Sequence, residues 1–99
     1  MKLWLDDDDT RIVPEGYKHV HSVNEAKLTI LNCILTNEPI EALDLDNDLG
    51  EFAYDGGDGH KLLDWLVETK RFFPVKLHTM NPVERQYMQT TINRYWPSK

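Results

Sequence analysis

The first nine residues, MKLWLDDDD, constrain the fold more than any other feature of the sequence. Four of the first five residues are apolar, and four aspartates follow at once. A short apolar run that is cut off by charge is typical of a buried strand that ends at the surface. We therefore expect a strand with carboxylates at its carboxyl end, which is the edge where ligands bind in open α/β sheets.

Strands and helices alternate along the rest of the chain. The first predicted strand covers residues 1–7. The spacing of apolar residues, together with helix-capping and turn residues, predicts further strands at 17–21, 40–46 and 74–78. The same signals predict helices at 22–36, 59–69 and 81–95. This alternation is typical of one α/β domain over residues 1–99, with about four mostly parallel strands flanked by three helices. The segment joining the first two strands is shorter than an ordinary parallel crossover. A helix-free parallel return and an antiparallel pairing both remain open.

Two of the predicted helices begin with capping residues. Ser22 and Glu25 form a capping box at the first helix, and Asn81 precedes a proline as the N-cap of the last. Residues 51–59 contain three glycines and are predicted to be a loop. The positions of the first helix predicted to face the core are Val23, Ala26, Ile30, Leu31 and Ile34.

Charge and cysteine content narrow the classes of function. The net charge is −6, which disfavours binding of duplex nucleic acid because that binding depends on Lys and Arg neutralising phosphates. Cys33 is the only cysteine, so an internal disulfide is excluded and a reducing, cytoplasmic location is favoured. The first apolar run is too short for a signal peptide, and no apolar stretch approaches the ~20 residues that span a bilayer.

Acidic residues follow more than one predicted strand. In a parallel sheet the carboxyl ends of three predicted strands would meet on one edge. These three strand ends carry Asp6 and Asp7, Asp46 and Asp48, and His78 and Thr79. Two carboxylates ~4 Å apart repel by roughly 4 kcal/mol at an effective dielectric near 20. A hard divalent cation relieves this repulsion and keeps positions for a phosphate. We therefore predict that Mg²⁺ or Mn²⁺ is held by Asp6, Asp7, Asp46 and Asp48, with Asp8 and Asp9 as solvated loop charge.

Histidine and arginine supply the other candidates. His78 can give or take a proton at neutral pH, or it can be a core-edge histidine bonded to a backbone carbonyl. Arg11 and Arg85 can fork onto phosphate oxygens, or form surface ion pairs. The four histidines show no zinc spacing. The three expected to be surface or packing residues are His19, His21 and His60.

Four short blocks resemble one family. They are residues 2–7 (KLWLDD, followed by Arg11), 45–50 (LDNDLG), 54–56 (YDG) and 78–85 (HTMNPVER). In order and spacing they are similar to the "LWLDD…R", "LDHDLG", "G-Y-D" and "HSANPVGR" blocks of the cyclic-phosphate-processing receiver-like domains. The resemblance implies a small receiver-like, flavodoxin-like three-layer fold that lacks the first receiver helix and the fifth strand.

The resemblance also implies roles for single residues. Asp6 and Asp7 match the receiver's metal-binding acids and Asp46 matches its phosphoacceptor. Thr79, near the receiver's hydroxyl position, and Asn81 lie in the last block and are predicted to contact substrate. The family is thought to act on cyclic phosphates, such as RNA 2′,3′-cyclic ends or cyclic nucleotides. The sequence departs from the family pattern where Asn47 replaces a histidine, Thr79 and Met80 replace Ser-Ala, and Glu84 replaces a glycine.

Three functional hypotheses follow. The first is metal-dependent hydrolysis of a cyclic phosphate, in which Asp46 and His78 are catalytic. A metal-activated water would attack phosphorus, and His78 would donate a proton to the leaving alkoxide. Arg11 and Arg85 would bind the phosphate oxygens. The alternative is a non-catalytic binding or adaptor module that grips a nucleotide or a protein partner, which Asn47 favours because an amide cannot transfer protons. A third reading is a degenerate receiver that accepts a phosphoryl group on Asp46.

Overall fold

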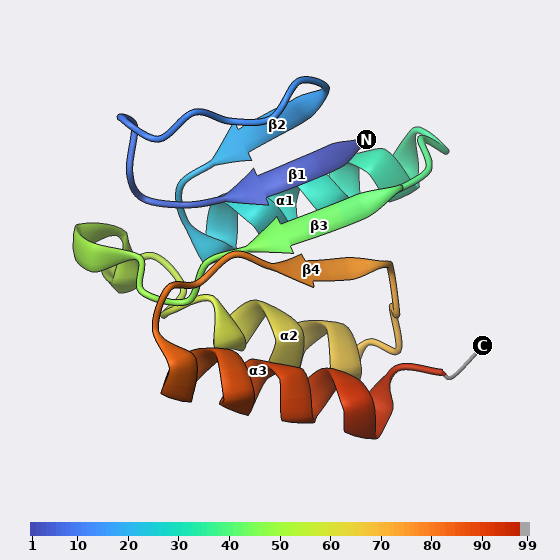
Figure 1. Cartoon of the computed structure of the whole chain (residues 1–99). Helices are drawn as coiled ribbons and strands as arrows, with labels where there is room; N and C mark the ends of the chain where they lie inside the picture. The colour runs from blue at the N-terminus through green and yellow to red at the C-terminus, as the bar shows by residue number, and fades with distance from the viewer. Residues whose placement is uncertain (98–99) are drawn as a thin grey trace.

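The computed structural model describes residues 1–97. Its elements (Figure 1) are, in chain order, β1 (Lys2–Leu5), β2 (Tyr17–Val20), α1 (Val23–Leu35), β3 (Ala42–Leu45), the 3₁₀ helix η1 (Gly50–Tyr54), α2 (His60–Glu68), β4 (Val75–Leu77) and α3 (Pro82–Tyr95). The predicted architecture of four strands and three helices is confirmed. Residues 51–59, whose glycines favoured the prediction of a loop, overlap the short helix η1.

The four strands form one sheet in the order β2-β1-β3-β4, and every neighbouring pair is parallel. Leu5, the last residue of β1, is in register with Val20 of β2 and with Leu45 of β3. Of the two arrangements left open for the first two strands, the parallel one is therefore observed, and the return at 6–16 contains no helix. All four arrowheads in Figure 1 consequently point to the same edge of the sheet.

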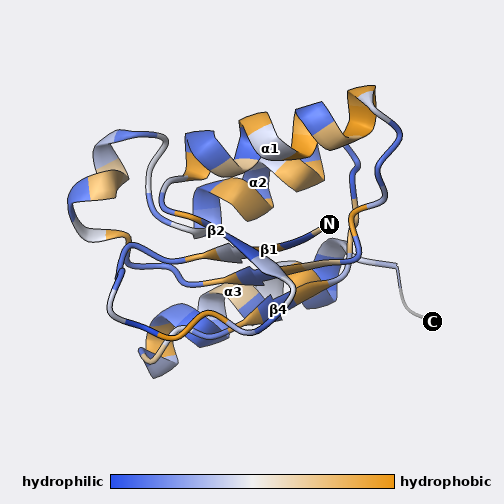
Figure 2. Cartoon of the chain, turned by 90° about the horizontal axis from the view of Figure 1, so that it is seen from above, coloured by the Kyte–Doolittle hydropathy of each residue, from blue (hydrophilic) through white to orange (hydrophobic). Residues whose placement is uncertain are grey.

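The hydrophobic core lies between the sheet and the helices, and Met88 of α3 belongs to it. Figure 2 shows α1 and α2 together on one side of the strands, and α3 packs against α2 and β4. Leu3 and Leu5 of β1 and Leu43 and Leu45 of β3 are buried in this core. Each buried leucine contributes about 2 kcal/mol of transfer free energy, so the apolar alternation along the strands determines which face of the sheet is covered.

Helix α1 faces the core with a narrower stripe than the sequence predicts. Val23, Ala26 and Ile30 are buried as expected, and the stripe continues through Cys33. Leu31 and Ile34 were also predicted to face the core, and that prediction is wrong, because they are 38% and 39% exposed. Apolar spacing in a helix marks a broad face, whereas the sheet and α2 cover only one row of its side chains.

The N-terminus of α1 is capped as predicted. Ser22 Oγ accepts a hydrogen bond from the Glu25 N–H at 3.0 Å and donates one to Asp55 Oδ2 at 2.7 Å. Glu25 reaches back to the N–H of His21 at 2.6 Å, one residue before the cap. We expect Ser22→Ala to lower the free energy of unfolding by about 1–2 kcal/mol, because one helix donor loses its acceptor.

Urea unfolding of Ser22→Ala beside Ser22→Thr tests this prediction. The threonine variant keeps a hydroxyl and should lose much less stability. An alanine variant as stable as the wild type would show that the cap carries no stabilisation.

Among residues 1–97, none of the helices has the length and apolar character needed to cross a bilayer.

Candidate functional site

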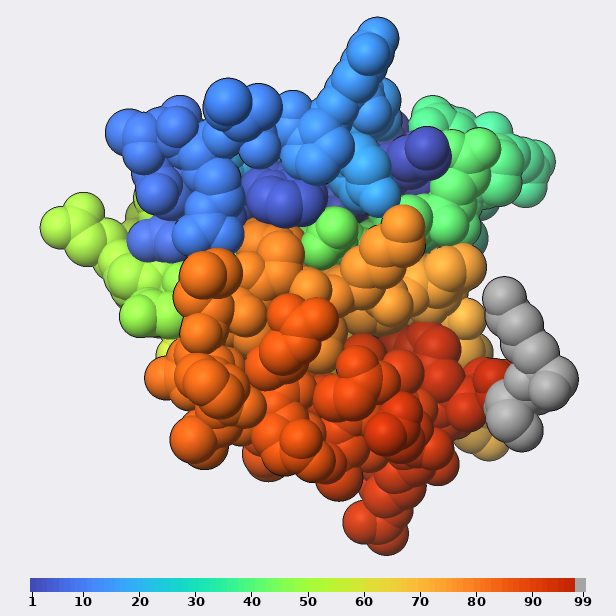
Figure 3. Space-filling model, viewed as in Figure 1, coloured from blue at the N-terminus to red at the C-terminus, as the bar shows by residue number. Residues whose placement is uncertain are grey.

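A cleft of about 590 Å³ lies at the carboxyl edge of the sheet. In Figure 3, the blue loop after β1, the green segment after β3 and the orange segment after β4 meet at this edge. Seven of the lining residues are acidic, and among the described lining residues Arg11 alone carries a positive side chain. The lining consists of Asp6, Asp7, Asp8, Asp9, Arg11, Asp46, Asp48, Gly50, Thr79, Met80, Asn81 and Glu84.

Asp6 is the most enclosed acid of the cleft. Its side chain is 1% exposed, and Oδ1 accepts a hydrogen bond from the N–H of Asp8 at 2.9 Å. Its other oxygen, Oδ2, lies 3.3 Å from Arg11 Nη1 and 3.1 Å from His78 Nε2. A buried carboxylate needs such partners, because removing the charge from water is otherwise unfavourable.

Two further carboxyl groups have raised pKa values. Burial raises the pKa of Asp46, and the neighbouring charge of Asp6 adds to the effect. Burial likewise raises the pKa of Asp7, with further contributions from the charges of Asp6, Asp48 and Asp8. The convergence predicted from the strand ends is therefore present, and it produces the mutual repulsion that a bound cation relieves.

His78 lies behind Asp6, and it is not among the residues that line the cleft. Its ring stacks on Trp4, with centroids 3.7 Å apart and planes 3° from parallel. Nε2 faces Asp6 Oδ2 and Nδ1 faces Asp44 Oδ1 at 2.8 Å. The backbone-carbonyl alternative for this histidine is therefore wrong. Direct donation from His78 to a leaving group is not supported either, since both nitrogens face carboxylates.

Asp44 is a site residue that the sequence analysis left without a role. It lies in β3, two residues before Asp46, and it is in register with Lys76, two residues before His78. The spacing of these residues could have identified the contact, but only if β3 and β4 were already known to be neighbours. Strand order, which the sequence does not display, decided this pairing.

The Asn47 side chain forms hydrogen bonds through both its amide nitrogen and its amide oxygen. Its Nδ2 donates to Glu84 Oε1 at 2.8 Å, and its Oδ1 accepts the N–H of His60 at 2.9 Å. The side chain thus joins the end of β3 to the beginnings of α2 and α3. Asn47 and Glu84 are two of the departures from the family pattern, and here they contact each other.

The last matched block reaches the cleft only in part. Thr79 is buried at the lining, and its Oγ1 lies 3.4 Å from the N–H of Asn81. Asn81 also lines the cleft, but its Oδ1 caps α3 by accepting the N–H groups of Val83 and Glu84. Arg85 is exposed and does not line the cleft. The predicted clamp of two arginines on one phosphate is therefore not formed.

The donor atoms fit a hard divalent cation. Asp6, Asp46 and His78 each offer an atom within 4.8 Å of the others, and carboxylate oxygens are the ligands that Mg²⁺ and Mn²⁺ prefer. Asp7 and Asp48 add carboxylates from the same lining. Asp8 and Asp9, predicted as solvated loop charge, border the cleft as well.

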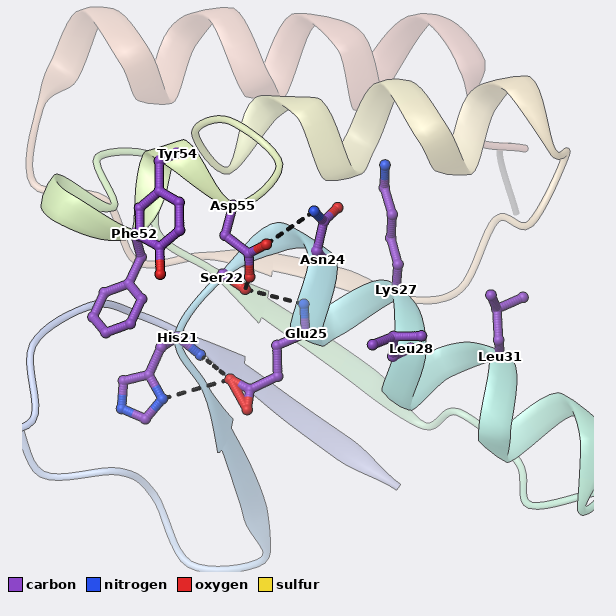
Figure 4. Close-up of a pocket in the computed structure, with 10 residues that line it drawn as sticks. All are labelled: His21, Ser22, Asn24, Glu25, Lys27, Leu28, Leu31, Phe52, Tyr54 and Asp55. Atoms are coloured by element: carbon purple, nitrogen blue, oxygen red, sulfur yellow. Dashed lines mark hydrogen bonds and ion pairs between the residues drawn. The ribbon is translucent and has the colours of Figure 1, made fainter.

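A second cavity of about 780 Å³ lies beside α1 and η1 (Figure 4). Leu28 and Leu31 of α1 and Phe52 and Tyr54 of η1 give it a largely apolar lining. None of the residues predicted to bind metal or substrate lines this cavity. The acidic cleft is therefore the candidate site for phosphate chemistry.

The chain matches the family model of the cyclic-phosphate processing receiver domain over residues 1–94. No curated protein and no solved structure matches the chain significantly. The matched range contains every strand and nearly all of the last helix, so it covers both the sheet and the whole lining of the cleft.

Proposed function

This chain belongs to the family of cyclic-phosphate processing receiver domains, and on that premise we propose that it hydrolyses a cyclic phosphate in its acidic cleft. The family implies a cyclic-phosphate substrate or partner. The observation that carries the proposal is the convergence of Asp6 and Asp46 at the ends of two parallel strands, with Arg11 of the following loop beside Asp6. Substrates of the right chemistry are RNA 2′,3′-cyclic ends and cyclic nucleotides.

The acids of the cleft are suited to hold a divalent cation, Mg²⁺ or Mn²⁺. Asp6 and Asp46 would be its central ligands, with Asp7 and Asp48 at the same lining. When bound, such a cation supplies positive charge for the phosphate oxygens and makes a water more acidic. Without it, an anionic phosphate would meet seven acidic side chains and a single arginine.

In the proposed reaction, a water oxygen forms a bond to phosphorus while one of the two ring ester bonds breaks. Asp46 would accept the proton of the water, because its carboxylate lies beside Asp6 at the proposed cation site, within reach of a water bound there. The ring opens to a phosphomonoester, and the leaving alkoxide takes a proton from solvent in the open cleft. Asp46 then returns its proton to solvent, so that the net reaction consumes one water and regenerates the carboxylate.

Arg11 and Thr79, which both line the cleft, would bind the phosphate. The guanidinium of Arg11 has five N–H donors, lies 3.3 Å from Asp6 Oδ2 through Nη1, and is 36% exposed in the cleft. Its remaining donors can therefore meet phosphate oxygens. Arg85 has no part in this proposal, because it lies outside the lining.

His78 is a positioning residue in this mechanism. Its ring is stacked on Trp4 and bonded to Asp44, so its Nε2 holds Asp6 Oδ2 in a fixed place.

Incubation of the purified chain with 2′,3′-cyclic nucleotides and Mg²⁺ or Mn²⁺ tests the proposal. We expect a phosphomonoester product whose formation stops when EDTA removes the metal. A chain that forms no product with any of the four 2′,3′-cyclic nucleotides in either metal would contradict hydrolysis. Chromatography or phosphorus NMR distinguishes the cyclic substrate from its product.

The fully engaged side chain of Asn47 favours a second candidate, a binding or adaptor module without chemistry. Asn47 offers no proton-transfer group, and its amide is bonded to Glu84 and to His60. Thermal shift measurements in the same mixtures separate the two functions. Stabilisation by metal and cyclic nucleotide without product formation would support binding alone.

A further inference from the structure

We propose that Asp9, His19 and His21 form a second metal site, specific for a zinc-class divalent ion and separate from the Mg²⁺-type ligands of the cleft. The three residues are brought together by the parallel pairing of β1 and β2. Each offers a ligand atom, and these atoms all lie within 4.8 Å of one another. The proposal does not depend on cyclic-phosphate hydrolysis.

The backbone places both imidazoles on one side of the sheet. His19 lies in β2 and His21 follows two residues later, so their side chains point the same way. Their rings lie 4.2 Å apart, centroid to centroid. Asp9 Oδ1 is 2.5 Å from His21 Nε2 and 3.9 Å from His19 Nδ1. Asp9 belongs to the loop after β1, which sequence spacing alone does not connect to the two histidines.

Groups outside the cluster orient both rings as they do in metal centres. His19 Nε2 lies 2.7 Å from the carbonyl oxygen of Asp6, so it carries the hydrogen and leaves Nδ1 as the lone-pair donor. Figure 4 shows Glu25 beside the His21 ring, where Oε1 is 3.5 Å from Nδ1. Nε2 of His21 is then the available ligand. A carboxylate or carbonyl on the distal nitrogen is the usual partner of a metal-bound histidine.

The donor set selects the class of metal. Two imidazoles and one carboxylate suit zinc and neighbouring transition metals better than Mg²⁺, which prefers oxygen alone. Tetrahedral ligands at about 2.0–2.1 Å from zinc are about 3.3 Å apart. The distances from Asp9 Oδ1 to His21 Nε2 and to His19 Nδ1 lie on either side of that value, and the Asp9 side chain, which is 75% exposed, has room to adjust.

An ion bound at this site would change the charge of the neighbouring acidic cleft. Asp9 also lines the acidic cleft, so an ion held there adds positive charge at the cleft wall. Three protein ligands leave a fourth position for water or an anion. The His60 ring, which lies against Tyr87 and Asn47, takes no part in this cluster and serves as an internal reference.

Zinc titration of the EDTA-treated full chain in excess Mg²⁺ tests the site. We expect one Zn²⁺ per chain, with affinity lowered at least about 10-fold in His19→Gln, His21→Gln and Asp9→Asn, since even outer-shell changes have effects of this size. His60→Gln and Asp64→Asn are the matched controls and should leave the affinity unchanged. In the wild type, the imidazole NMR signals of His19 and His21 should shift on adding Zn²⁺, while those of His60 stay in place.

Two outcomes would overturn the site. One is the absence of zinc binding in excess Mg²⁺, which would leave Asp9 and His21 as an ordinary ion pair. The other is a zinc affinity that falls in Asp46→Asn and not in His21→Gln, which would place the ion in the cleft. The NMR readout needs no variant, so poor folding of a variant would not prevent a decision.

Discussion

Replacing Asp46 with asparagine should lower the turnover of a 2′,3′-cyclic nucleotide by at least about 100-fold, the effect expected for losing a general base. Asp46 is buried at the end of β3 and faces Asp6 across the cluster that is suited to a metal. The substitution removes one anionic ligand and the group proposed to accept the proton of water. Initial rates with Mg²⁺ and Mn²⁺ measure the loss.

The fold should survive this change. The amide oxygen of the Asp46→Asn variant can still accept the N–H of Asn47, as Asp46 Oδ1 does at 2.8 Å. Because burial raises the pKa of the Asp46 carboxyl, the charged form opposes folding at pH values above the ordinary pKa. In EDTA at neutral pH, Asp46→Asn should therefore be at least as stable as the wild type in urea.

A matched control keeps the activity loss interpretable. Asp64 lies on α2 away from the cleft lining, so Asp64→Asn makes the same chemical change without touching the site. It should retain wild-type turnover. An Asp46→Asn variant that turns over substrate like this control would remove Asp46 from the mechanism.

Replacing Gly59 with alanine should lower the free energy of unfolding by about 3 kcal/mol, at the upper end for overpacking. Gly59 is the N-cap residue of α2, and its N–H donates to the carbonyl of Asn47 at 2.8 Å. A methyl group added there would overlap the backbone carbonyl of Asp46. A backbone atom cannot rotate away as a side chain can, so α2 and the end of β3 must separate.

The same separation should disturb the cleft, because Asp46 follows β3 directly. We therefore expect lower turnover in Gly59→Ala beyond what its folded fraction explains. Gly16→Ala is the control: a methyl group there meets nothing within 4 Å, and φ is +88°, so only about 1–2 kcal/mol of backbone strain is expected. Urea unfolding compares the two. A Gly59→Ala loss no larger than that of Gly16→Ala would rule out the close approach.

Much of the site could be predicted because parallel strands end at a shared edge. Asp6 and Asp46 follow buried apolar runs, and that pattern is sufficient to place both at the carboxyl edge. The position of Arg85 could not be predicted in this way. It lies in the matched block at the start of α3, but the direction of a helical side chain depends on how the whole helix packs against α2 and β4.

The sequence by itself determined the alternation of strands and helices, the capping of α1 by Ser22 and the edge at which the acids gather, because these depend on local spacing and short-range hydrogen bonds. Only the tertiary structure decided that His78 bonds Asp44 behind Asp6, and that Asp9 meets His19 and His21. Those contacts join residues of different strands and loops. Strand order and register, set by packing of the whole sheet, bring them within reach.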